Sequence, residues 1–225
     1  MLQEVASLNR ISIDYIQAGR YHDAIAGFQK AMHLVEKSCV ADFEIDVEAA
    51  YMKATSSGGH TITEVAAAAF TLPFLPPDTN DDLFEIYNRP FLIDESFIIP
   101  PSVLHLTLCF NIGLVYHLLG LQNTKIEYMK MAIRHYQCGL YLIKRNAVEN
   151  FSSTGQYWLT LALLTNAGNI LWSLWCTKEA LECRDRVHAL LGTKNVFVLP
   201  KEDLVFFLQV CSNGIFCNRN AAPVA

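Results

Sequence analysis

The first 35 residues hold two consecutive runs of apolar side chains at spacings of three and four, separated at Gly19. That spacing predicts two amphipathic helices, with Gly19 ending the first. Because the connection between them is short, the two helices must pack antiparallel. One such pair cannot bury its apolar face alone, so the rest of the chain has to supply further helices that cover it.

Two later stretches repeat this pattern. The tripeptides N-I-G at 111–113 and N-A-G at 166–168 place Asn and Gly at matching positions of two apolar runs. A small, large, small alternation at spacings of four and three is shared by Ala24, Phe28 and Ala31 and by Ala132, Tyr136 and Gly139. Small residues allow close approach of two helices while large ones fill the space between them. The sequence therefore predicts three helix pairs.

The N-terminal pair resembles the tetratricopeptide repeat, whose period is about 34 residues. The residues that carry the resemblance are Leu8, Ile11, Ser12, Tyr15, Gly19, Tyr21, Ala24, Phe28 and Ala31. The resemblance implies an all-α fold in which antiparallel helix pairs form a solenoid of about three repeats, at 5–38, 103–146 and 156–191. We expect one domain over 1–225, with a long insert at 39–101 and a C-terminal extension at 193–225. The repeats together with an I-Y-x-R-P-F-type element in the insert are similar to a large, uncharacterised group of tetratricopeptide-like proteins of microalgae, which implies this architecture and no activity.

A small β element is expected beside the helices. Residues 83–93 alternate large apolar side chains with others and contain Ile, Tyr and Phe, and 205–210 are similarly β-prone, so a short sheet could join them. Residues 200–212 could equally begin a helix after Pro200. The tract 60–72 fits either a short strand or a short helix.

Charge and cysteine content exclude several classes of protein. There are 22 acidic and 17 basic side chains, with no run of Lys or Arg, which argues against a nucleic-acid partner. Seven cysteines without a C-x-x-C motif, and no secretory signal at the N-terminus, predict an intracellular, cytoplasmic location. The uncharged stretches 96–124 and 150–177 are long enough to span a bilayer, but they coincide with first helices of the repeats, so burial in the array is the preferred interpretation.

No chemistry is predicted. His105 and Cys109 stand four residues apart on one helix face, but spacing offers no further ligands, so we expect no metal and no cofactor. The sequence contains no nucleophile elbow and no glycine-rich nucleotide loop, which predicts that the protein is not an enzyme.

The remaining class is protein binding, with a protein or peptide partner lying in a concave groove formed by the first helix of each pair. The expected groove residues are Asn9, Ile13, Ile16, Asn111, Leu114, His117, Thr165, Asn169 and Trp172. An asparagine amide can donate to and accept from a peptide backbone at once. The family's best-known groove clamps a C-terminal carboxylate with basic residues; Ile13 and Ala162 hold those positions here, so that clamp is not expected.

The sequence leaves two questions open. The insert covers either one end of the array or the groove itself, and in the second case the protein would be occupied by its own chain. The alternative function is a structural subunit of a larger assembly, with exposed aromatics expected at Trp158, Trp172 and Trp175 as its interface.

Overall fold

The computed structural model describes residues 1–39, 86–96, 99–146, 154–193, 196 and 199–217. This part of the chain is all helical and contains no strand. Its helices are α1 Leu2–Gln17, α2 Tyr21–Cys39, α4 Pro101–Asn123, α5 Ile126–Asn146, α6 Thr154–Ser173, α7 Thr177–Leu191 and α8 Lys201–Cys217.

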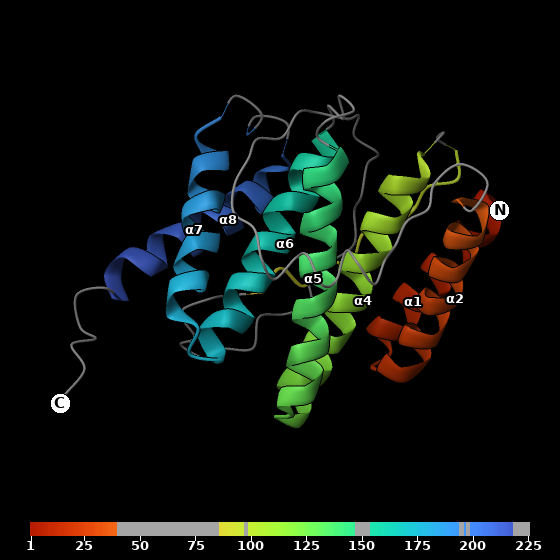
Figure 1. Cartoon of the computed structure of the whole chain (residues 1–225), viewed down its shortest axis with the longest axis horizontal. Coiled ribbons are helices and arrows are strands. Elements are labelled where there is room, and N and C mark those ends of the chain that lie inside the picture. The colour runs from red at the N-terminus through yellow and green to blue at the C-terminus, as the bar shows by residue number, and fades with distance from the viewer. Residues whose placement is uncertain (40–85, 97–98, 147–153, 194–195, 197–198, 218–225) are drawn as a thin grey trace.

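The helices pack in chain order. The pairs α1 with α2, α4 with α5, and α6 with α7 are each in contact, and α2 with α4 and α5 with α6 join one pair to the next. Figure 1 shows the resulting row, which runs from α1 and α2 at one end to α7 and α8 at the other. A direct contact between α4 and α6 brings first helices of neighbouring pairs together. These three pairs coincide with the ranges 5–38, 103–146 and 156–191 expected to be helical.

Two helix ends have the same turn with different residues. After α1, the Gly19 amide donates to the Ile16 carbonyl and the Arg20 amide to the Tyr15 carbonyl, with Gly19 at φ +70°. After α6, the Trp175 amide donates to the Trp172 carbonyl and the next amide to the Leu171 carbonyl, with Trp175 at φ 61°. Both are Schellman endings, which favour glycine at the left-handed position. Trp175 therefore adopts a strained backbone conformation in a role that Gly19 fills without strain.

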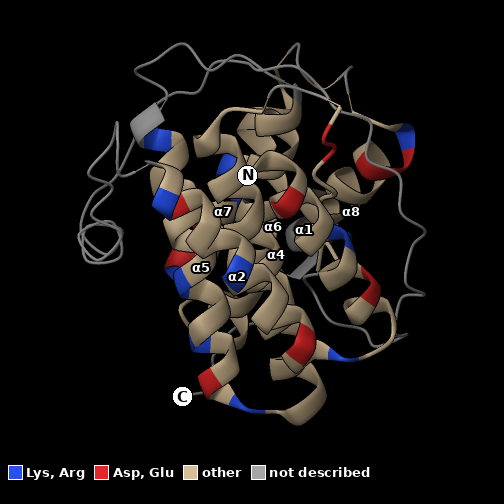
Figure 2. Ribbon diagram, turned by 90° about the vertical axis from the view of Figure 1, so that its right-hand side faces the viewer, with Lys and Arg blue, Asp and Glu red and all other residues tan. Residues whose placement is uncertain are grey.

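The first helices of the second and third pairs are mostly apolar and contain no charged residue. Neither α4 nor α6 contains Lys, Arg, Asp or Glu, and Figure 2 shows the charged residues on the other helices and on the connections. A helix of this kind has to be covered all round. In the described part of the chain, α4 is the helix long and apolar enough to cross a membrane by length and composition, and 83% of its most apolar stretch is buried among the other elements.

The small, large, small alternation lies at the helix contacts. Ala24, Phe28 and Ala31 of α2 and Ala132 and Tyr136 of α5 are all fully buried. The ring of Tyr136 lies so close to Gly113 of α4 that a β-carbon there would stand 2.6 Å from it. Glycine at this position therefore lets α4 and α5 approach each other.

The expected small β element is not found in the described residues. Residues 201–217 form the helix α8, so the strand interpretation of 205–210 was wrong and the helix alternative is confirmed. Residues 86–93 form neither a helix nor a strand. Residues 60–72 lie outside the described part of the chain.

Candidate functional site

Residues 86–94, here called the inner segment, form neither helix nor strand and contact the first helices of the pairs, α1, α4 and α6. Tyr87, Phe91 and Ile93 are only 1%, 3% and 2% exposed. An irregular segment buried in this way needs partners for its backbone amides and carbonyls. These partners are side chains of α1, α4 and α6, and they form the candidate functional site.

Asn111, in the middle of α4, binds the backbone of Phe91 with both ends of its amide. Its Oδ1 accepts from the Phe91 N–H at 2.8 Å, and its Nδ2 donates to the Phe91 carbonyl at 2.8 Å. Asn9 of α1 donates to the same carbonyl at 3.1 Å and accepts a second bond from Asn111 at 2.9 Å. Both asparagines are fully buried, so these bonds do not compete with water.

Asn166, on α6, repeats this arrangement at Tyr87. Its Oδ1 accepts from the Tyr87 N–H at 2.7 Å, and its Nδ2 donates to the Tyr87 carbonyl at 3.0 Å. The bound residues, Tyr87 and Phe91, are four apart on the inner segment. Asn9, Asn111 and Asn166 together are called the asparagine row below. The amides of the row contact main-chain atoms of the inner segment, so these bonds do not involve the side chains of Tyr87 and Phe91.

A polar chain behind the row fixes the orientation of Asn166. Its Nδ2 also donates to the Tyr136 hydroxyl at 3.2 Å, and that hydroxyl lies 3.4 Å from Nδ1 of His117. The other ring nitrogen of His117 lies 3.0 Å from Oδ1 of Asn169. All these groups are satisfied when His117 is neutral with its proton on Nε2. Burial lowers the pKa of His117 to about 4, which keeps it in that neutral form at physiological pH.

The start of α8 holds the inner segment at its other side. The Tyr87 hydroxyl donates to Asp203 at 3.0 Å, and Arg89 forms ion pairs with Asp203 at 3.2 Å and with Glu202 at 3.0 Å. The carboxylate of Asp203 is completely buried, and desolvation raises its pKa. Burial and the neighbouring Asp203 carboxylate raise the pKa of Tyr87, so its hydroxyl stays protonated and able to donate.

Aromatic rings receive the side chains of the inner segment. The Tyr87 ring stacks on Phe207, with centroids 5.3 Å apart, and meets Phe206 edge-on at 5.5 Å. Phe91 packs edge-on against Phe110 at 5.0 Å and against Trp158 at 5.5 Å. The sequence suggested 83–93 and 205–210 as paired strands; in the described part of these segments, Tyr87 contacts Phe206 and Phe207 through ring packing rather than through a sheet.

The predicted groove residues are placed as follows. Asn9 and Asn111 bind the inner segment, whereas His117 and Asn169 bind each other behind it. Except for Trp172, which is partly exposed, every one of them is buried; the other buried members are Ile13, Ile16, Leu114 and Thr165. Ile13 and Ile16 belong to the core cluster around α1 and α2, and Leu114 belongs to the cluster around α4 to α8.

Three contributors were not among the predicted site residues. Asn166 has the same place in N-A-G that Asn111 has in N-I-G, so the matching tripeptides were the signal that could have identified it. Tyr136 contacts Asn166 from α5, and Tyr87 arrives from the insert. No local spacing reveals either of these two contacts.

The predicted absence of further metal ligands near His105 and Cys109 has to be revised. Cys138 of α5 lies beside them, and the ligand atoms of the three residues all lie within 4.8 Å of one another. Spacing along one helix could not show this, because the third residue comes from a different helix.

Comparison of the chain with protein-family models, curated proteins and solved structures finds no match.

Proposed function

We propose that this chain is a tetratricopeptide-like array that binds an extended segment of a partner protein along the asparagine row. The array assignment is supported by the three consecutive helix pairs and by the burial of Ala24, Phe28 and Ala31 at their contact. It is also supported by the contact of Gly113 with Tyr136, which is the small-against-large packing expected between the two helices of a repeat.

The observation that carries the binding function is that a single asparagine amide both donates to and accepts from the backbone. Asn111 and Asn166 each donate to and accept from one backbone unit of an extended chain, at matching positions of neighbouring repeats. Main-chain hydrogen bonds supply affinity for an extended peptide, and pockets for alternate side chains supply specificity. The rings that pack against Tyr87 and Phe91 would supply that specificity.

On this proposal, the inner segment occupies the place that the partner would take. A partner segment would have to displace it, and the ion pairs of Arg89 with Asp203 and Glu202 would break in the exchange. Glu202 is largely exposed, so its pair contributes little, whereas the buried Asp203 would need a replacement donor. The partner segment that fits best carries two aromatic residues four apart and a basic residue between them.

The proposal is tested with a peptide supplied from outside. A chain carrying Tyr87→Ala and Phe91→Ala loses the rings that seat its own inner segment, and a fluorescein-labelled peptide with the sequence of residues 84–96 is added to it. We expect saturable one-to-one binding by fluorescence anisotropy. The unaltered chain should bind this peptide far more weakly, because its own segment competes at high effective concentration.

The control adds Asn111→Leu and Asn166→Leu to the double alanine variant. The leucines are close to asparagine in size but cannot pair with backbone, so binding should be lost while circular dichroism shows the helices intact. Absence of binding to the double alanine variant, or equal binding with the leucines in place, would refute the proposal. Partners crosslinked in a native extract can then be ranked by competition with the same peptide.

A structural subunit of a larger assembly is the second candidate. Trp175 is 88% exposed, which is unusual for a tryptophan and favours an interface there. Trp158, expected to be exposed in that role, is buried, and Trp172 is only partly exposed. Sedimentation of the purified chain decides between the two: a monomer at high concentration argues against the subunit.

A further inference from the structure

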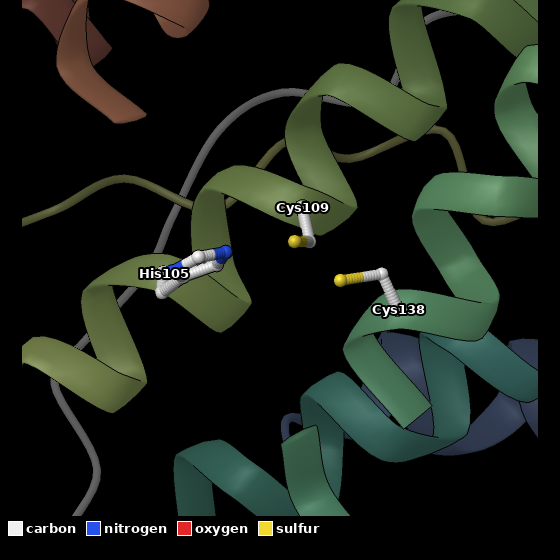
Figure 3. A group of neighbouring side chains, drawn as sticks. All are labelled: His105, Cys109 and Cys138. Atoms are coloured by element: carbon white, nitrogen blue, oxygen red, sulfur yellow. The ribbon is translucent and has the colours of Figure 1, made fainter. Parts of the chain in front are cut away.

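A second cluster of chemically capable side chains lies apart from the asparagine row. His105 and Cys109 of α4, one helical turn apart, face Cys138 of α5, as Figure 3 shows. All three are buried, at the contact between α4 and α5, and both cysteines are free. The two thiols are embedded in the apolar cluster that contains Val35, Ile112 and Leu142.

One nitrogen atom of this cluster makes no hydrogen bond. Nδ1 of His105 is buried and has no hydrogen-bond partner, and the side chain as a whole is only 1% exposed. A buried nitrogen without a partner destabilises the folded chain. A ligand that accepts a lone pair from this nitrogen would remove that cost.

The two thiols lie near each other across the helix contact, and their sulfur atoms and a ring nitrogen of His105 are all within 4.8 Å of one another. The thiolate is the form that ligates metals. The carboxylate of Glu36, on α2, acts on both sulfur atoms and adds negative charge near the cluster.

We propose that His105, Cys109 and Cys138 form a buried binding site for one thiophilic d¹⁰ metal ion. Thiolate and imidazole ligands select Cu⁺ and Zn²⁺ over hard cations such as Mg²⁺ and Ca²⁺. Three ligands satisfy Cu⁺, whereas Zn²⁺ takes the same three and a fourth, and two thiolates neutralise its charge. On binding, the thiol protons leave to solvent, the two sulfurs and one imidazole nitrogen donate lone pairs, and no oxidation state changes.

The bound ion would join the N-terminal half of α4 to the C-terminal half of α5. Since a metal that binds only the folded chain stabilises it by mass action, loading should raise the unfolding temperature. The site shares no residue with the asparagine row. Metal binding and peptide binding can therefore succeed or fail independently.

The test uses the full chain, reduced and kept free of oxygen, with each ion in a separate arm. Zn²⁺ is offered from a chromophoric chelator, and Cu⁺ from a copper(I)-specific chelator with ascorbate present. Each ion is added to the folded chain and also during refolding, because a buried site can be closed to entry. We expect one equivalent to be retained in at least one arm, with a raised unfolding temperature.

Three single variants and one control identify the ligands. Cys109→Ser, Cys138→Ser and His105→Gln should each weaken retention by more than about 100-fold, since changing an outer-shell residue alone costs about 10–100-fold. Cys183→Ser, which removes a buried cysteine on α7, should retain the ion like the unaltered chain. X-ray absorption of the loaded, unaltered chain should show two sulfur neighbours and a nitrogen neighbour of imidazole type.

The absorption measurement keeps the proposal testable if a serine variant does not fold. Failure to retain either ion under both loading conditions would overturn the proposal. So would retention that Cys183→Ser removes and Cys138→Ser leaves unchanged, or an absorption spectrum without sulfur neighbours.

Discussion

Replacing Asn166 with leucine should destabilise the protein because it removes the partners of two buried backbone groups. The Tyr87 N–H and carbonyl, now bonded at 2.7 and 3.0 Å, would be left without partners. The Tyr136 hydroxyl would lose one donor but keep its contact with His117. Each unsatisfied backbone group costs about 1–3 kcal/mol, and burying leucine in place of an amide returns part of the loss. We expect a net loss of about 3 kcal/mol.

Asn111→Leu should cost less, about 2 kcal/mol, although it removes the same number of bonds to the inner segment. The reason is that the Phe91 carbonyl keeps its bond from Asn9, so that only the bond from the Phe91 N–H is lost without a second asparagine beside it. Asn123→Ala provides the control, because Asn123 lies at the exposed end of α4 and bonds only within its own helix. It should change stability by no more than about 0.5 kcal/mol.

Urea unfolding followed by circular dichroism measures these differences, and hydrogen exchange locates them. The amides of Tyr87 and Phe91 should lose protection in the respective leucine variants while amides in the middle of α4 keep theirs. A loss below about 1 kcal/mol for Asn166→Leu would contradict the reasoning, because it is less than one stranded group costs. Equal losses for the two leucine variants would contradict the part assigned to Asn9.

Three further predictions concern other parts of the fold. Trp175→Gly should stabilise the chain by about 1 kcal/mol in urea unfolding, since glycine relieves the left-handed strain and the lost indole is largely exposed. His117 has its pKa lowered from 6.5 to about 4 in the folded state, so the unfolded chain binds the proton first. Neutral His117 therefore contributes about 3 kcal/mol to the free energy of unfolding above pH 6.5, and this contribution is lost as the pH falls towards 4. In His117→Gln, the fall in stability between pH 7 and pH 4 should be smaller by about that amount. Tyr87→Phe should lower stability by about 1–2 kcal/mol in thermal unfolding, because buried Asp203 loses a hydroxyl donor, and a change below about 0.3 kcal/mol would contradict the importance of that bond.

Local patterns in the sequence predicted the helices but not what lies across them. Apolar spacing and Gly19 located the first pair, and the matching N-I-G and N-A-G tripeptides located the first helices of the next two. These patterns work because a helix reports its own buried face through residues three and four apart. The strand-like composition of 205–210 misled for the same reason, since a fully buried helix and a buried strand both appear as an apolar run.

The candidate site depends on contacts between residues far apart in the sequence. Asn111 was predicted to bind backbone, but Phe91, the residue it binds, is 20 positions away in an insert without helical periodicity. Cys138 was overlooked as a neighbour of Cys109 because α5 brings it there. Such contacts depend on how whole helices pack, so no local sequence pattern indicates them.

The apolar surface of α4 has a consequence for the way the chain is made. During synthesis α4 leaves the ribosome before α5, α6 and α8, which later cover it and the inner segment beside it. At roughly 5–20 residues per second, α8 is complete on the order of 5–20 seconds after α4. At the start of that interval, α4, which contains no charged residue, has only the N-terminal helix pair to cover it, because α5 and α6 are not yet made. The nascent chain is therefore a substrate for chaperones that hold apolar helices, and slowing translation beyond α4 should increase aggregation, whereas slowing it before α4 should not.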